Sequence, residues 1–366
     1  MAIRNAHKSL RATKVLAVAI AIALVPSTMI AAGVSNGDVA ASKAAAINHA
    51  KHGKYCSATA LNQYAACLSE VGDDHFTANA VCTNVSDPQA RSECFADARQ
   101  ESGEALQLCG EQRSARGNLC SVLGEDRYDP DINPADFDDD FTNLTNPNPW
   151  YPLDIGNQWV YESGDGKEIV AVEVLDKTKQ IQGVTCIVVN DRSFDDGRLV
   201  ENTDDWFGHR RDGTVDYCGE ISQDFGYFDG DDPQESELVE IEGSWKAGRD
   251  GAKSGTLFPS MPVVGRIYRT EYAAGDAEDI VEVVSTNYGY GVDPDLDRFV
   301  PQALAELMCP NHDCVVMRDT TPLEPGEFEH KYYAVGIGQF LEVKPEEGEF
   351  AQLVDCNFDA KCEQLP

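Results

Sequence analysis

Hydrophobic and polar positions divide the chain into segments of different character. Residues from about 40 to 124 are rich in Ala, Gln, Ser and Arg and have the composition of helices. Residues 125–149 are rich in Asp, Pro and Asn without apolar periodicity, which predicts an acidic linker. From residue 150 to about 355, β-branched and aromatic residues predominate and predict strands. Residues 356–366 form a short tail that contains two more cysteines.

Asp-Gly pairs separate the β-prone runs. Asp165-Gly166, Asp196-Gly197 and Asp212-Gly213 each stand between two such runs, and Asp-Gly is a strong signal for a two-residue hairpin. About ten consecutive antiparallel strands, interrupted by one short helix at 301–308, predict a large antiparallel β-meander, folded as a curved sheet or half-barrel. A two-sheet sandwich is the competing architecture. With the helices that precede it, the chain is expected to be an α+β protein.

Residues 1–32 have the pattern of a secretory signal peptide. Basic residues precede an apolar run from Val15 to Val25, Pro26 ends this run, and small residues follow around Ala32. The apolar run is too short to span a bilayer well. We therefore expect cleavage near Ala32 and a secreted protein, periplasmic or extracellular, without a membrane span.

The cysteines are expected to form disulfides. Their number, 12, is even, no C-x-x-C pair occurs, and an oxidising compartment favours disulfides over metal thiolates. Eleven residues separate Cys56 from Cys67, and Cys109 from Cys120. Such a span rises about 16 Å along a helix, which is too far for a disulfide within one helix. Each of these cysteines must therefore bond to another helix.

Four antiparallel helices would satisfy this spacing. Breaks are expected at Gly72, at Ser86-Asp87-Pro88 and at Ser102-Gly103, the second being a helix start with a proline in its first turn. The resulting hypothesis is a nested set of disulfides: Cys56 with Cys120, Cys67 with Cys109, and Cys82 with Cys94. It is one of many connectivities that six cysteines allow.

The charge balance restricts the partners. The formal net charge is −34 at pH 7, with 63 acidic and 29 basic residues. Phosphate contacts require Lys or Arg, so nucleic acid and anionic membranes are excluded as default partners. Three explanations of the acidic charge remain open: a cationic partner, a divalent metal, or adaptation to a saline solvent.

The acidic linker contains candidate calcium ligands. Oxygen-bearing side chains alternate along it, as in calcium loops, but Pro134 stands where an EF-hand has Gly, and no Glu occupies its last position. No cofactor is required, and a calcium-stiffened linker competes with the favoured interpretation, a solvated acidic surface. The candidate ligands are Asp129, Asp131, Asn133, Asp136 and Asp140.

Aromatic residues of the β region are candidates for a ligand site. Trp159 and Tyr161 alternate with Val160, so their rings share one face of a strand. That face is either ordinary core or the lining of a cavity for a small apolar ligand inside a half-barrel. The candidate residues are Trp159, Tyr161, Trp206, Tyr332 and His330, of which His330 is more readily explained as a structural histidine than as a general base.

Several motifs resemble a family of secreted bacterial β-rich proteins of uncharacterised function. They are NPWYPL at 148–153, WVYE at 159–162, GSWKAG at 243–248, TPLEPG at 321–326 and EHKYY at 329–333. The resemblance covers roughly residues 110–345 and implies a secreted β-rich protein, but it brings no activity. The chain departs from the family at Cys309–Cys314, where a disulfide is expected.

The sequence favours binding over catalysis. It contains no G-x-S-x-G, no H-E-x-x-H and no phosphate-binding glycine loop. We therefore predict a non-catalytic secreted protein that binds a partner protein or a small apolar ligand. The alternative is an extracellular hydrolase that uses a metal and paired carboxylates, which are plentiful here.

Overall fold

A computed structural model describes residues 36–366, so the predicted signal peptide lies outside the described residues. The chain divides into two compact units. One ends at Tyr128 and includes Pro322–Pro325, and the other comprises Asp129–Thr321 and Gly326–Pro366. The first is helical and the second is built on an antiparallel sheet, which makes the chain an α+β protein.

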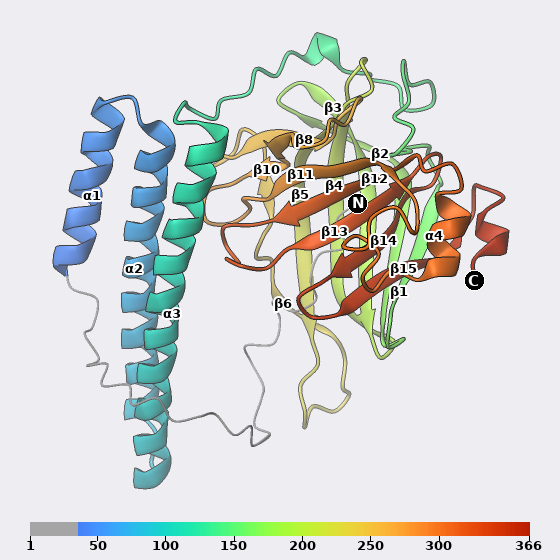
Figure 1. Ribbon diagram of the computed structural model, residues 1–366. Coiled ribbons are helices and arrows are strands. Elements are labelled where there is room, and N and C mark those ends of the chain that lie inside the picture. The colour runs from blue at the N-terminus through green and yellow to red at the C-terminus, as the bar shows by residue number, and fades with distance from the viewer. Residues whose placement is uncertain (1–35) are drawn as a thin grey trace. The chain divides into compact units, whose positions relative to one another are not determined.

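The helical unit contains α1 (Asn36–Lys51), α2 (Tyr55–Thr83) and α3 (Pro88–Leu123), shown in blue to green in Figure 1. The turn between α2 and α3 ends where the Asp87 side chain accepts a hydrogen bond from the Ala90 amide (2.8 Å), the usual N-cap geometry. Three disulfides join α2 to α3 in the nested arrangement expected from the spacing: Cys56–Cys120, Cys67–Cys109 and Cys82–Cys94.

The expected fourth helix does not form. Gly72 lies inside α2, and Ser102-Gly103 lies inside α3, so two of the three expected breaks are wrong. A glycine inside a helix costs only about 1 kcal/mol relative to alanine. Tertiary packing outweighs that cost, because Leu68, Val71 and Cys109 form a small core between the two helices.

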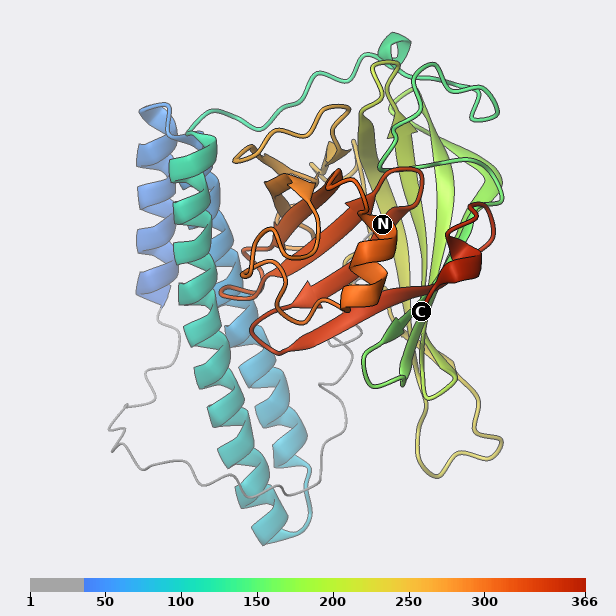
Figure 2. The same cartoon turned by 45° about the vertical axis from the view of Figure 1, so that its right-hand side comes forward.

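The second unit is one antiparallel sheet of 15 strands (Figures 1 and 2). The strands pair in the order β10-β8-β5-β4-β3-β2-β1-β15-β14-β13-β12-β11-β9, and β6 and β7 also pair with β5. Because every strand belongs to this one sheet, the architecture is the curved sheet and not the sandwich.

The strands of this sheet have the following bounds: β1 Gln158–Ser163, β2 Glu168–Ile181, β3 Val184–Asp195, β4 Arg198–His209, β5 Val215–Gly226, β6 Glu237–Glu240, β7 Trp245–Lys246, β8 Lys253–Phe258, β9 Ile267–Arg269, β10 Glu271–Tyr272, β11 Ile280–Tyr288, β12 Cys314–Thr320, β13 Glu329–Ala334, β14 Gly338–Lys344 and β15 Glu349–Cys356. The helix expected at 301–308 is α4 (Gln302–Met308). Short 3-10 helices occur at Pro134–Asp136 and Cys362–Gln364.

The three Asp-Gly pairs lie in the turns between β1 and β2, β3 and β4, and β4 and β5, as predicted. At the second turn Asp196 and Gly197 both have positive φ (47° and 76°), the requirement of the tight hairpin turn that Asp-Gly favours. Three more disulfides fix this unit: Cys186–Cys218, Cys309–Cys314 and Cys356–Cys362.

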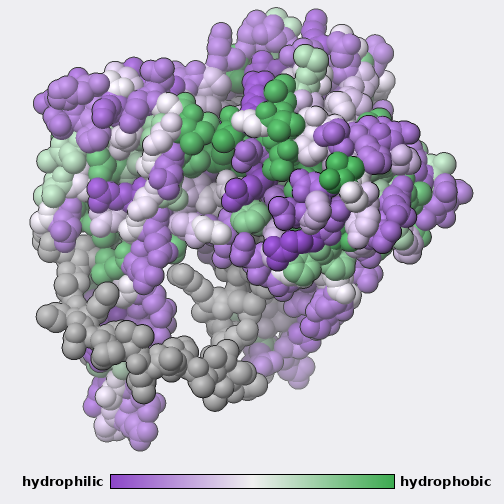
Figure 3. Space-filling view, viewed as in Figure 1, coloured by the Kyte–Doolittle hydropathy of each residue, from purple (hydrophilic) through white to green (hydrophobic). Residues whose placement is uncertain are grey.

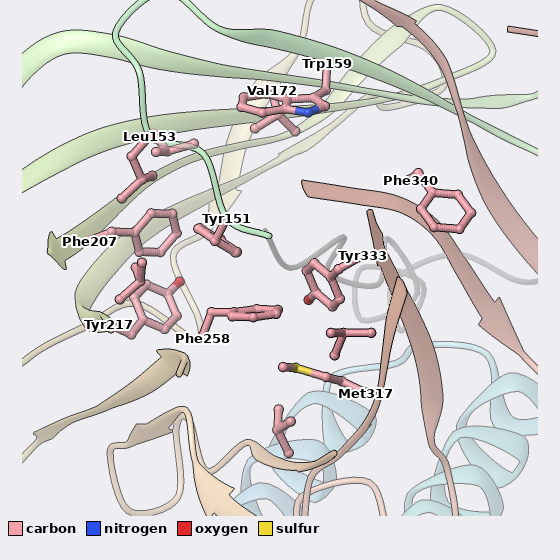
Figure 4. Close-up of a cluster of buried hydrophobic side chains, with 14 of the residues drawn as sticks. Tyr151, Leu153, Trp159, Val172, Phe207, Tyr217, Phe258, Met317, Tyr333 and Phe340 are labelled. Carbon is pink, nitrogen blue, oxygen red and sulfur yellow. The ribbon is translucent and has the colours of Figure 1, made fainter. Parts of the chain in front are cut away.

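An aromatic core fills the inside of the curve (Figure 4). Tyr151 stands at its centre, with ring centroids 5.8 Å from Phe207 of β4 and 6.5 Å from Tyr333 of β13. Phe258 of β8 packs against both Tyr151 and Tyr333. Side chains from distant strands of one sheet therefore meet across its interior, which is the packing of a half-barrel.

Hydrophilic residues predominate on the face drawn in Figure 3, in keeping with the strongly acidic composition. Within residues 36–366, no helix is long and apolar enough to cross a membrane.

Candidate functional site

The inward face of β3, β4 and β5 changes from apolar to polar along the strands. The register places one residue from each strand side by side in a row, and rows two residues apart share this face. The deepest row is apolar or aromatic, and the next three are increasingly polar. The rows are Ile187–Phe207–Tyr217, Val189–Asp205–Glu220, Asp191–Thr203–Ser222 and Ser193–Glu201–Asp224.

A β-bulge brings Tyr217 and Glu220 to the same face. Tyr217 pairs with Phe207 and Gly219 pairs with Trp206, so Cys218 is the extra residue of β5. The Tyr217 hydroxyl is hydrogen-bonded to both Asp205 and Glu220, the latter at 2.7 Å. Asp205 and Glu220 are both buried. The bulge thus builds a buried pair of carboxylates around one phenol.

The next rows continue this polar surface toward solvent. Thr203 Oγ1 lies 2.7 Å from Glu201 Oε1 and 3.0 Å from Ser222 Oγ. Along β4, exposure increases from the buried Asp205 to the half-buried Glu201. The polar rows therefore occupy the part of the interior where the sheet begins to meet solvent.

Asp191 is the exception in this network. Its exposed fraction is 8%, yet within residues 36–366 no group donates a hydrogen bond to its carboxylate. Burial, together with the carboxylates of Glu201 and Asp205, raises the pKa of Asp191 well above its ordinary value. Buried carboxylates are normally paired, so one that accepts no hydrogen bond from the described part of the chain and has a raised pKa is a candidate functional position.

Two predicted ligand residues share the face of Asp191. Across β2, Trp159 lies in the row of Asp191 and Tyr161 in the row of Ser193. Both rings are buried, and their polar atoms are bonded to backbone: Trp159 Nε1 donates to Ile337 O (2.8 Å) and Tyr161 Oη to Gln339 O (2.9 Å). Burial and the carboxylates of Asp191 and Glu342 raise the pKa of Tyr161 well above its ordinary value.

A second polar cluster lies on β12, β13 and β14. Lys331 is buried, with its Nζ 2.7 Å from Asp319, 3.5 Å from Glu329 and 4.0 Å from Glu342. Burial alone would lower the pKa of Lys331, but these carboxylates raise it well above its ordinary value, so the ammonium stays charged. The cluster is a buried ion network that fixes these strands to one another.

The other predicted ligand residues lie elsewhere. Trp206 is on the face of β4 opposite Asp205, under Lys179 Nζ at 3.3 Å from the ring centroid. Tyr332 is on the face of β13 opposite Lys331 and Tyr333, and its hydroxyl donates to Leu296 O (2.7 Å). His330 shares that face and is half-buried beside Phe328. The five candidate residues therefore do not line one cavity, because Trp206 and Tyr332 lie on the face of the sheet opposite Trp159 and Tyr161.

His330 has the environment of a structural histidine. Its burial and the nearby Arg318 lower its pKa to about 4. The ring is therefore neutral at neutral pH, packed between Phe328 and Tyr332 with ring centroids at 5.3 and 6.5 Å.

The predicted calcium ligands are engaged separately. Asp129 pairs with Lys253, Asn133 accepts a hydrogen bond from the Ala135 amide (3.3 Å), and Asp140 accepts from the Thr142 amide and hydroxyl. Asp131 and Asp136 belong to the same linker. Within residues 36–366, no three His, Cys, Asp or Glu side chains, these two included, are grouped so that they could hold a metal ion.

No protein-family model matches the chain, and no curated protein matches its sequence. Two solved structures resemble it. One is a proposed exported protein with a YMCC-like fold from Bacteroides fragilis, 14% identical, with 57% of this chain and 98% of that chain covered and a TM-score of 0.29. The other is a proposed lipoprotein from Parabacteroides distasonis, 8% identical, with 58% and 99% covered and a TM-score of 0.29. At these values neither structure assigns a function to this chain.

Proposed function

We propose that this chain is an exported, non-catalytic binding protein, and that its half-barrel binds a small organic cation beside Asp191. Export is supported by the six disulfides, which form and persist in oxidising compartments. The secreted family that the motifs resemble is consistent with this compartment and stays a prediction.

The observation that supports the ligand class is the buried Asp191 carboxylate, to which no group of residues 36–366 donates a hydrogen bond. A buried carboxyl avoids an unpaired charge by keeping its proton, which its raised pKa indicates, and a bound cation would stabilise the ionised form. Glu201 and Asp205 add negative potential at the same place, as their effect on the pKa of Asp191 indicates. A bound ammonium or guanidinium group would be stabilised by all three carboxylates.

An organic cation fits this place better than the other ligand classes considered. An apolar ligand is disfavoured because Trp159 and Tyr161 are already buried and the accessible rows are polar. A hard metal ion requires several converging oxygen ligands, and residues 36–366 contain no such group. Aromatic residues in the same rows as Asp191 are typical neighbours of organic cations.

The test is a ligand titration of the secreted protein with its disulfides intact. Tetramethylammonium, spermidine and arginine amide are compared with tert-butanol and with NaCl of equal ionic strength. We expect at least one organic cation to raise the melting temperature saturably, while tert-butanol and NaCl do not. Equal responses to all solutes would overturn the proposal.

Two variants localise the effect. Asp191→Asn removes the charge in question, and Asp204→Asn removes the same charge from the opposite face of β4 as a matched control. We expect the cation response to disappear in the first variant and to persist in the second. Persistence in both would place any cation binding elsewhere.

Calcium binding by the linker and the hydrolase alternative remain predictions. For calcium, the expected result is a higher melting temperature with millimolar calcium at constant high NaCl, lost in Asp129→Asn with Asp131→Asn. For the hydrolase, the check is a screen against generic esterase, phosphatase, glycosidase and peptidase substrates.

A further inference from the structure

A second binding feature lies on the arm that follows β5, independent of Asp191. Every residue from Phe228 to Glu242 is exposed. Within this arm, β6 pairs with β5 through Leu238 opposite Phe225 and Glu240 opposite Asp224. Among the described residues β6 has a sheet partner along one edge only. An edge strand presents backbone hydrogen-bonding groups that can pair with another chain.

The arm also exposes large apolar side chains. Phe228, Leu238, Val239 and Ile241 are exposed by 41%, 53%, 46% and 56%. Proteins usually protect exposed edges with short strands, Pro or charged side chains, above all Lys, and the charges on β6 are Glu237 and Glu240. No lysine stands on this strand, and exposed apolar residues grouped along an edge indicate a contact surface.

The negative charge of the arm indicates which kind of chain could pair with β6. Residues 226–244 contain seven Asp and Glu and no Lys or Arg. A second copy of this chain would bring the same negative charges opposite these, which is unfavourable. A segment carrying Lys or Arg at alternate positions would place positive charges against the acids and apolar side chains against Leu238 and Ile241.

We propose that β6 binds an extended basic segment of another protein, which adds to the sheet as a further strand. Main-chain hydrogen bonds to the edge of β6 that pairs with no described strand would supply affinity, and the alternation of basic and apolar side chains would supply specificity. This mode requires the ligand to be both basic and able to form a strand, and the experiment separates the two requirements.

The probes are three peptides of equal length added to the full secreted protein. One alternates Lys and Val, one alternates Glu and Val, and one has the charge of the first but proline in place of alternate valines, which prevents strand pairing. Amide hydrogen exchange of Glu237–Glu240 reports pairing, and fluorescence anisotropy gives Kd. We expect slowed exchange and saturable binding with the Lys-Val peptide alone.

The variants act on the arm without touching the core. Val239 is the bulge residue of β6, without a partner opposite on β5, so Val239→Pro should leave the fold intact and weaken binding. Replacing Glu237, Glu240 and Glu242 by Gln should weaken Kd about tenfold, since three exposed charge pairs are lost. Met261→Asp, at another exposed apolar position, is the control and should bind as the parent protein does. Leu238→Asp provides a second arm variant if Val239→Pro shifts the melting temperature.

Three results would overturn the proposal. Equal binding of the proline-containing peptide would indicate general attraction between opposite charges. Unchanged Kd in both Val239→Pro and Leu238→Asp would remove β6 from the interface. Self-association of the protein that is lost in Leu238→Asp would make a second copy the occupant. None of these results bears on the Asp191 site, since its ligand response is measured without peptide.

Discussion

Tyr217 and Glu220 are three residues apart on β5, yet the Tyr217 hydroxyl lies 2.7 Å from the Glu220 carboxylate. Strand alternation would place them on opposite faces. The bulge at Cys218 and Gly219 changes the alternation by one residue and brings both side chains inward. The inward position of Glu220 beside Asp205 therefore depends on one irregularity of a single strand.

Gly219 is expected to be essential to this bulge. Its φ is +135°, and a Cβ there would lie 2.5 Å from Trp245 O and 2.7 Å from Lys246 Cα, both backbone atoms that cannot move aside. Gly219→Ala should lower the free energy of unfolding by about 1–3 kcal/mol, the usual cost of a strained backbone position. Chemical denaturation measures it. Gly230 has a positive φ as well (+99°) but open space around a Cβ, so an equal loss in Gly230→Ala would show that the backbone conformation alone, and not the contact with Trp245 and Lys246, sets the cost.

Asp191→Asn should stabilise the unliganded protein at neutral pH. Because the pKa of Asp191 is raised in the folded state, the wild type loses stability as pH rises from about 4 through that raised pKa. The asparagine variant does not suffer this loss and should gain about 1–3 kcal/mol at pH 7. Urea denaturation between pH 4 and 8 checks it. A variant that is less stable than the wild type throughout would indicate that Asp191 has a structural role.

Lys331→Met should have the opposite effect. The substitution leaves Asp319, Glu329 and Glu342 without their buried ammonium, which should cost about 3–5 kcal/mol at pH 7. Burial already raises the pKa of Glu329 and of Glu342, and Lys331 lowers both, so without the lysine these two pKa values rise further and the deficit should shrink as pH falls and the two carboxylates become protonated. The measurement is the free energy of unfolding of both proteins at pH 7 and pH 5. A deficit independent of pH would show that lost packing, and not unpaired charge, is the cause.

His330 should contribute to acid sensitivity. Its folded-state pKa is about 4 against an ordinary value of 6.5, so the neutral ring stabilises the fold fully above pH 6.5. This contribution is lost as pH falls from 6.5 to about 4, because the unfolded state binds the proton first. His330→Gln should flatten the stability profile in that window. An unchanged slope in thermal unfolding at several pH values would assign the acid sensitivity to other groups.

Each disulfide of the helical unit should be needed for its stability. Replacing Cys67 and Cys109 by Ala should cost about 2–4 kcal/mol, since the open chain gains freedom when unfolded. Circular dichroism during urea titration measures this loss. Non-reducing peptide mapping checks the connectivity itself, and a Cys67–Cys82 bridge would contradict it.

Local spacing predicted much of the fold. The eleven-residue intervals place Cys56 and Cys67 on one helix face, so the geometry of two antiparallel helices restricts their partners. The Asp-Gly turns are set by backbone conformation, which is also local. Gly72 was misleading because disulfides and packing, which are not local, determine whether a weak helix position breaks the helix.

The polar interior could not be predicted in the same way. Asp191 stands between Asn190 and Arg192, and Asp205 follows Asp204, so no alternation of apolar and polar residues indicates which face of the curved sheet is inward. The bulge at Gly219 adds a change of alternation that no pattern of hydrophobicity reveals. For the same reason Trp206 and Tyr332 were named as candidates for the ligand site, although they lie on the face of the sheet opposite Trp159 and Tyr161.

The pKa of Asp191 itself provides the most direct test of the proposed site. A titration of the Asp191 side-chain carboxyl by carbon NMR, with and without a saturating organic cation, follows the one group on which the account depends. The account predicts a pKa well above the ordinary value in the free protein, and a clear fall when the cation is bound. An ordinary pKa in the free protein, or a raised one that the cation leaves unchanged, would contradict it.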